Sequence, residues 1–109
     1  MRPTLLFATL TALAFISPLA FAELTLYKNF KCSAPSERRE VHIYRDTSEV
    51  TAGPICRVDY LKAGETNALW TAQNSVEFCD VKAQELADRL EAANFKCVAT
   101  ATFEQSTNQ

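Results

Sequence analysis

The sequence of 109 residues is 48% hydrophobic and 22% charged, with four cysteines, one histidine and two glycines, which fits one small globular domain. This length excludes two independently folded domains. The formal net charge of −2 is unlike that of nucleic-acid binders, which present a strongly basic face, so we expect no nucleic-acid partner.

Residues 1–22 have the features of a cleavable secretory signal peptide. A basic start at Arg2 precedes an apolar run over residues 5–16 and an Ala-Phe-Ala cleavage pattern at 20–22. The apolar run is shorter than the roughly 20 residues that a membrane-spanning helix needs. We therefore expect a periplasmic or secreted mature domain over residues 23–109, with no membrane span.

The charges are unevenly distributed along the mature chain. Residues 23–45 carry five Lys or Arg and three Glu, whereas residues 75–104 carry six acidic and three basic side chains. Such polarity could orient a partner at long range.

The first half of the mature chain predicts strands joined by polar turns. Apolar residues alternate with polar ones in the strand candidates, and Gly, Pro and Ser mark the connections. The predicted elements are a short strand at 23–27, a polar connection at 28–37, a second strand at 39–46, a Gly-Pro turn at 53–54 and a third strand at 55–62.

The second half predicts a hairpin, a helix and a last strand. A turn at Gly64 joins the third strand to a fourth at 67–73. Asn74 and Ser75 can cap a helix that runs to about Ala93, with Glu77 placed for a capping-box contact. One arc of this helix is apolar and contains Val76, Cys79, Ala83, Leu86, Ala87, Leu90 and Ala93.

We expect the helix to end at Asn94, a residue that tolerates the left-handed conformation. Apolar residues then recur at every second position over residues 95–103, which predicts a strand. Short connections favour antiparallel neighbours. We predict an α+β fold: an antiparallel sheet in the order β-β-β-β-α-β, with one helix packed on one face and two disulfides. The tail at 104–109 is expected to be loose.

Four cysteines in a short exported domain indicate two disulfides. Cys79 lies about 22 Å along the helix axis from the C-terminal end of the helix. From that end, the strand can bring Cys97 back by only about 10 Å. The two cysteines should therefore be too far apart to form a disulfide. The predicted hairpin brings Cys56 close to the helix start. We therefore pair Cys56 with Cys79 and Cys32 with Cys97, and Cys32 with Cys79 is the main alternative.

Residues 56–97 carry a recognisable skeleton: a cysteine-bearing strand, a Leu-Trp pair, a cysteine entering an Ala-rich helix, and an aromatic residue and a cysteine after it. This skeleton resembles that of small exported bacterial proteins of unassigned activity. Where that pattern has Gly-Trp after the helix, this chain has Asn94 and Phe95. The resemblance implies export and disulfide bonding, and it implies no catalytic residue.

Groups for catalysis or metal binding are sparse. His42 is the only histidine, and it shares a strand face with Glu40 and Tyr44. These three side chains could form a proton shuttle, but the sequence favours a surface histidine without a catalytic role. The acidic pairs Glu37 with Glu40 and Asp59 with Glu65 are interpreted mostly as solvated charges. The cysteines lack CxxC spacing, so we expect no metal, no cofactor and no enzymatic activity.

Binding residues are better represented. Trp70 alternates with Leu69, and we expect the Trp to be buried under the N-terminal segment. Phe78 and Val81 fall outside the apolar arc of the helix, so either the N-terminal segment covers them or they form an exposed patch. Two arginines, Arg38 and Arg39, could hold an acidic partner or remain solvated.

These features favour a non-enzymatic protein-binding module, such as an inhibitor, an immunity-type protein or an envelope accessory protein, with a protein partner in the envelope or outside the cell. The alternatives are a carrier of a small apolar ligand and a small hydrolase using His42. The partner and the oligomeric state do not follow from the sequence.

Overall fold

The computed structural model describes residues 4, 11, 12, 23–47 and 53–101. The predicted tail and nearly all of the predicted signal peptide lie outside these residues. The described elements follow the predicted order: β1 (Leu24–Ser33), β2 (Arg38–Asp46), β3 (Cys56–Lys62), β4 (Glu65–Ala72), α1 (Val76–Ala92) and β5 (Lys96–Ala101).

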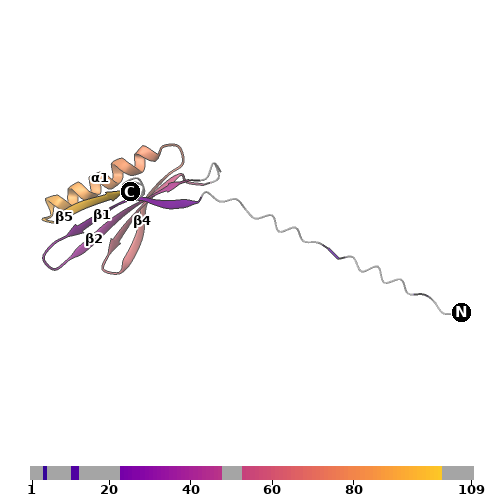
Figure 1. The fold of residues 1–109 in the computed structure, drawn as a ribbon, viewed down its shortest axis with the longest axis horizontal. Coiled ribbons are helices and arrows are strands. Elements are labelled where there is room, and N and C mark those ends of the chain that lie inside the picture. Colours follow the sequence, from indigo (N-terminus) through magenta and orange to yellow (C-terminus); the bar gives the residue numbers. More distant parts are fainter. Residues whose placement is uncertain (1–3, 5–10, 13–22, 48–52, 102–109) are drawn as a thin grey trace, which may run out of the picture.

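The five strands form one antiparallel sheet in the order β4-β3-β2-β1-β5. Strands β1 to β4 lie side by side in chain order, and β5 returns from the helix to pair with the other edge of β1. Helix α1 lies along one face of the sheet (Figure 1). The predicted α+β fold with one helix on one face is therefore confirmed.

Strand alternation divides the side chains between the two faces of the sheet. Val41, Ile43 and Val58 face α1 and are almost completely buried. On the helix, small side chains at Ala83 and Ala87 allow a close approach to the sheet. The buried core consists of Phe30, Cys32, Val41, Ile43, Cys56, Val58, Cys79, Ala83, Ala87 and Leu90.

Strand β1 is longer than the sequence predicted. The prediction ended this strand at Tyr27, whereas β1 continues to Ser33. A bulge between Leu26 and Lys28 shifts the register, after which Phe30 and Cys32 are buried. The predicted polar connection at 28–37 was thus wrong over its first half, because Lys28 and Asn29 interrupt the run of apolar residues next to the bulge.

Ser75 is the N-cap of α1, as predicted, but the expected capping-box contact is absent: its side chain makes no cap hydrogen bond. The Ser75 hydroxyl instead donates to the Glu77 carboxylate at 3.0 Å. A backbone N–H and this hydroxyl hold the pKa of Glu77 below its ordinary value of 4.5. The helix start is therefore favoured by an ionised Glu77, and this contribution is lost as the pH falls through the lowered pKa.

Both disulfides pair as predicted, Cys32 with Cys97 and Cys56 with Cys79, and no cysteine is free. Cys32 and Cys97 are direct register partners on β1 and β5. Cys56 and Cys79 join β3 to the first turns of α1, with 6.2 Å between their Cα atoms. The alternative pairing of Cys32 with Cys79 is excluded. Two disulfides are compatible with an oxidising compartment.

Candidate functional site

An apolar surface lies where α1 begins above β4. Trp70 pairs with Val58 on the helix-facing side of the sheet and packs, partly buried, against the core. Its neighbour Leu69 has no register partner on β3 because it occupies a bulge, and it is 40% exposed. The sequence predicted that Trp70 is buried under the N-terminal segment, whereas Trp70 is only partly buried. The element on this side of the sheet is α1, and the N-terminal segment is strand β1 within the sheet.

The first half of α1 contributes two exposed apolar side chains to this surface. Phe78 is 39% exposed and Val81 is 54% exposed. The Lys82 ammonium lies 5.9 Å from the centre of the Trp70 ring and 5.8 Å from that of Phe78. Of the two alternatives that the sequence left open, the structure shows the exposed one. We call Trp70, Phe78, Val81 and Lys82 the aromatic patch.

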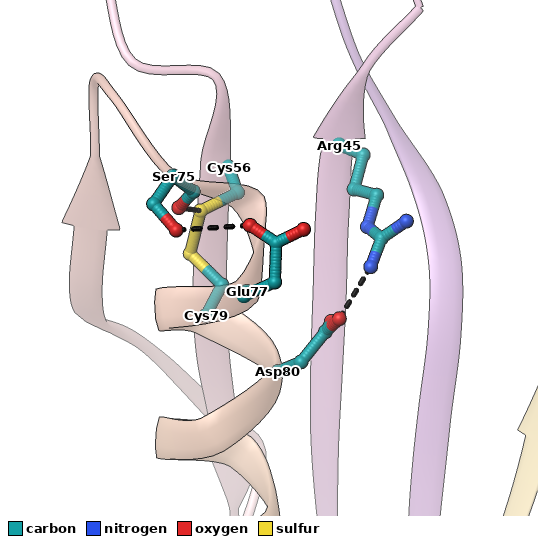
Figure 2. The surroundings of a disulfide bond; sticks show 6 residues. All are labelled: Arg45, Cys56, Ser75, Glu77, Cys79 and Asp80. Carbon is teal, nitrogen blue, oxygen red and sulfur yellow. Dashed lines mark hydrogen bonds and ion pairs between the residues drawn. A yellow bond between two sulfur atoms is a disulfide. The ribbon is translucent and has the colours of Figure 1, made fainter.

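The aromatic patch rests on a helix start that is tied to the sheet twice (Figure 2). The Cys56–Cys79 disulfide follows Phe78 directly in the chain and lies against the backbone carbonyl of Ser75, 3.5 Å from the Cys56 sulfur. The residue that follows Cys79, Asp80, forms an ion pair with Arg45 of β2. Three of the four residues of the patch, Phe78, Val81 and Lys82, therefore belong to a helix start that is fixed to the sheet.

The exposure of Val81 predicts that it contributes little to folding. We expect Val81→Ser to change the free energy of unfolding by less than about 0.5 kcal/mol, because more than half of the side chain is already in water. Urea denaturation of the oxidised protein measures this, with Ala83→Ser at the fully buried neighbouring position as the destabilised reference. A loss for Val81→Ser as large as for Ala83→Ser would show that the side chain is structural.

The two predicted binding arginines lie at the other end of the sheet, next to the β1–β2 turn, and they differ from each other. Arg39 is largely buried: it stacks over Phe95 at 5.3 Å and its guanidinium donates to Glu37 at 3.3 Å and to the Arg38 carbonyl at 2.9 Å. Arg38 is exposed and forms no ion pair with the described residues. The structure thus does not join the arginines to the aromatic patch.

The face of the sheet opposite α1 carries the histidine. The His42 Nδ1 atom lies 3.4 Å from the Tyr44 hydroxyl, and its Nε2 atom lies 3.7 Å from the Glu40 carboxylate. Its register partners across the sheet are Asn29 and Asp59. The shared strand face of His42, Glu40 and Tyr44 agrees with the sequence, and the histidine is half-buried among polar neighbours rather than freely exposed.

Sequence reasoning missed the role of Asp59 on this face. It was interpreted as a solvated charge, whereas it is only 5% exposed and accepts two hydrogen bonds from Arg57, at 2.8 and 3.2 Å. The Arg57 guanidinium also lies over the Tyr44 ring at 4.6 Å. The i,i+2 spacing of Arg57 and Asp59 on one strand face was the available signal for this pair.

The Arg57–Asp59 pair leads to a stability prediction. We expect Arg57→Gln to lower the free energy of unfolding at neutral pH by about 1–3 kcal/mol, because it leaves a buried carboxylate without its charged donor. Urea denaturation measures the loss, and Arg38→Gln, at an exposed unpaired arginine, is the matched control. Equal stabilities of the two variants would contradict this role of Arg57.

The described residues contain no group of three or more His, Cys, Asp or Glu side chains placed to hold a metal ion. Their only helix, α1, lacks the length and hydropathy needed to cross a membrane. Comparisons with protein-family models, with curated proteins and with solved structures find no match to this chain.

Proposed function

We propose that the protein is a small exported, non-enzymatic binding module that docks a protein partner through the aromatic patch. The observation that carries this proposal is the placement of the partly exposed Trp70 and Phe78 rings around Lys82, on a helix start fixed by a disulfide. Trp and other large side chains in a rigid setting supply much of the binding energy in protein interfaces.

Rigidity supports the same proposal. A patch that is already ordered loses little conformational entropy on docking, so more of the contact energy appears as affinity. The two disulfides are consistent with a periplasmic or secreted location, and the resemblance to small exported bacterial proteins points the same way. We propose an inhibitor, immunity-type or envelope accessory role, since each requires a compact binding scaffold.

Site-specific photocrosslinking tests the proposed function. Benzoylphenylalanine is placed at Val81 in the patch and, as a matched control, at Gln84, an exposed residue on the same helix. Irradiation in envelope extract of the source organism should give a defined adduct from position 81 and none from position 84. Absence of an adduct from position 81, or the same adducts from both positions, would contradict docking through the patch.

A hydrolase centred on His42 is the second candidate, favoured by the line of Glu40, His42 and Tyr44 on one strand. A carboxylate, an imidazole and a hydroxyl in sequence are the components of a proton relay. Turnover of chromogenic ester or peptide substrates that is lost in His42→Ala would support this candidate. Absence of turnover of these substrates in the wild type would count against the hydrolase.

The carrier of a small apolar ligand remains the third proposal. Native mass spectrometry of the protein purified from its own source tests it, because a carried ligand would add mass to the folded chain. A single species at the mass of the disulfide-bonded chain would count against a carrier.

A further inference from the structure

Charge is divided between the two layers of the fold. The strands carry eight Lys or Arg and four Asp or Glu, whereas α1 carries five Asp or Glu and two Lys or Arg. The uneven charge that the sequence shows along the chain therefore becomes a basic sheet beneath an acidic helix. Helix α1 covers one face of the sheet, and no helix or strand of the described residues covers the opposite face (Figure 1).

Most of the unpaired positive charge lies at one corner of this sheet. Arg39, Arg45, Arg57 and Lys82 each have a carboxylate partner. Among the described residues, the basic side chains without an ion pair are Lys28, Lys31, Arg38, Lys62, Arg89 and Lys96.

Four of these six cations lie near the β1–β2 and β3–β4 turns. Ser33 is the register partner of both Arg38 and Lys96, and Lys31 lies two residues before it on the same strand face. Lys62 ends β3 beside the second turn. We call Lys31, Arg38, Lys62 and Lys96 the basic corner.

A hollow of about 1010 Å³ opens beside the basic corner, and three of its cations, Lys31, Arg38 and Lys62, line it. One cross-strand row runs through its lining over all five strands: Val98, Lys31, Glu40, Leu61 and Thr66. This row belongs to the face opposite α1, and its Val98 side chain is 59% exposed. The hollow therefore combines apolar surface with unpaired cations.

From this arrangement we propose that the basic corner binds an extended acidic peptide segment of a partner protein. The hollow is much larger than a small inorganic anion needs, and falls in the size range of sites for larger ligands. The cations Lys31 and Arg38 complement acidic side chains, and Leu61 and Val98 complement an apolar one.

The strand spacing indicates the kind of segment. Lys96 and Val98 are two residues apart on β5, which separates side chains on one face by about 7 Å. Side chains two apart in an extended peptide have the same spacing. A segment in which an acidic and an apolar residue are separated by one position can therefore contact a cation and Val98 together. Glu37, Glu40 and Glu65 also line the hollow and disfavour a purely polyanionic ligand there.

This inference does not depend on the aromatic patch, which lies on the other side of the sheet. The test uses the oxidised protein and a capped peptide, Glu-Ser-Val-Ser-Glu, followed by NMR amide shifts. We expect saturable shifts at Ser33, Thr66 and Val98, no such shifts with the Gln-Ser-Val-Ser-Gln peptide, and at least about fivefold weaker binding when NaCl rises from about 50 to about 300 mM.

Variants locate the binding. Lys31→Gln combined with Arg38→Gln should weaken the binding at least about tenfold, and Arg89→Gln, an exposed unpaired arginine on α1, should leave it unchanged. Both variants change exposed side chains, and circular dichroism verifies that each is folded.

Three results would overturn the proposal. The first is the absence of saturable amide shifts at about 5 mM peptide. The second is peptide binding that is weakened as much in Arg89→Gln as in the Lys31→Gln and Arg38→Gln double variant, and the third is amide shifts that map to α1. Phosphatidylglycerol vesicles are the comparison ligand. Binding of the vesicles at the basic corner, without binding of the peptide, would show that the ligand is a membrane surface and not a peptide.

Discussion

Replacing Cys32 and Cys97 together by alanine is expected to lower the free energy of unfolding by up to about 4 kcal/mol. The disulfide closes a loop across a sequence separation of 65 residues, so its loss returns a large conformational entropy to the unfolded chain. A domain this small buries a limited fraction of its surface and depends on such cross-links. The expected fall in Tm is about 15–25 °C.

Urea denaturation and calorimetry of the oxidised proteins measure this effect. The double variant Lys31→Ala with Val98→Ala is the control, because it changes a neighbouring register pair on the same two strands without removing a cross-link. The pairing of β1 with β5 remains in both proteins. A loss below about 1 kcal/mol, or the same loss in the control, would contradict the stabilising role of this disulfide.

Replacing Cys56 and Cys79 together by alanine should cost up to about 3 kcal/mol, because the loop it closes is shorter, with a sequence separation of 23 residues. The second effect of this change is local. Without the disulfide, the first turns of α1 remain attached to the sheet by the Arg45–Asp80 pair and by packing. We expect amide exchange to become faster at Cys79 to Lys82 than at Leu90.

Hydrogen exchange measured residue by residue distinguishes the local effect from general destabilisation. Asp80→Asn is the control, since it removes the ion pair alone and should cost no more than about 1 kcal/mol. Uniformly faster exchange along the whole of α1 in the Cys56 and Cys79 variant would show that the disulfide does not specifically hold the helix start.

The fold was largely predictable because its signals are local or geometric. The apolar arc of α1 and the hairpin turn at Gly64 are local patterns, and they bring Cys56 near Cys79. The length of the helix then excludes a bridge between Cys79 and Cys97, but the alternative of Cys32 with Cys79 was decided only by the structure. Strand periodicity failed at two bulges, at Tyr27 in β1 and at Leu69 in β4.

The candidate site was predictable only in part. Helical periodicity places Phe78 and Val81 outside the apolar arc of α1. Their exposure also depends on the strands with which the N-terminal strand β1 pairs, and that pairing joins segments far apart in the sequence. The burial of Asp59 depends on Arg57 bending over it on an uncovered sheet face. The basic corner needs the register of four strands, and no local pattern contains that register.

The most direct test of whether the disulfide-held aromatic patch is the binding surface is photocrosslinking from position 81. The experiment compares the wild-type background with the variant in which Cys56 and Cys79 are both replaced by alanine. Both proteins are used at a temperature at which circular dichroism shows them folded. The predicted result is a defined partner adduct from the oxidised wild type and at least about tenfold less from the variant. Equal adduct yields from the two proteins, or no adduct from either, would contradict it.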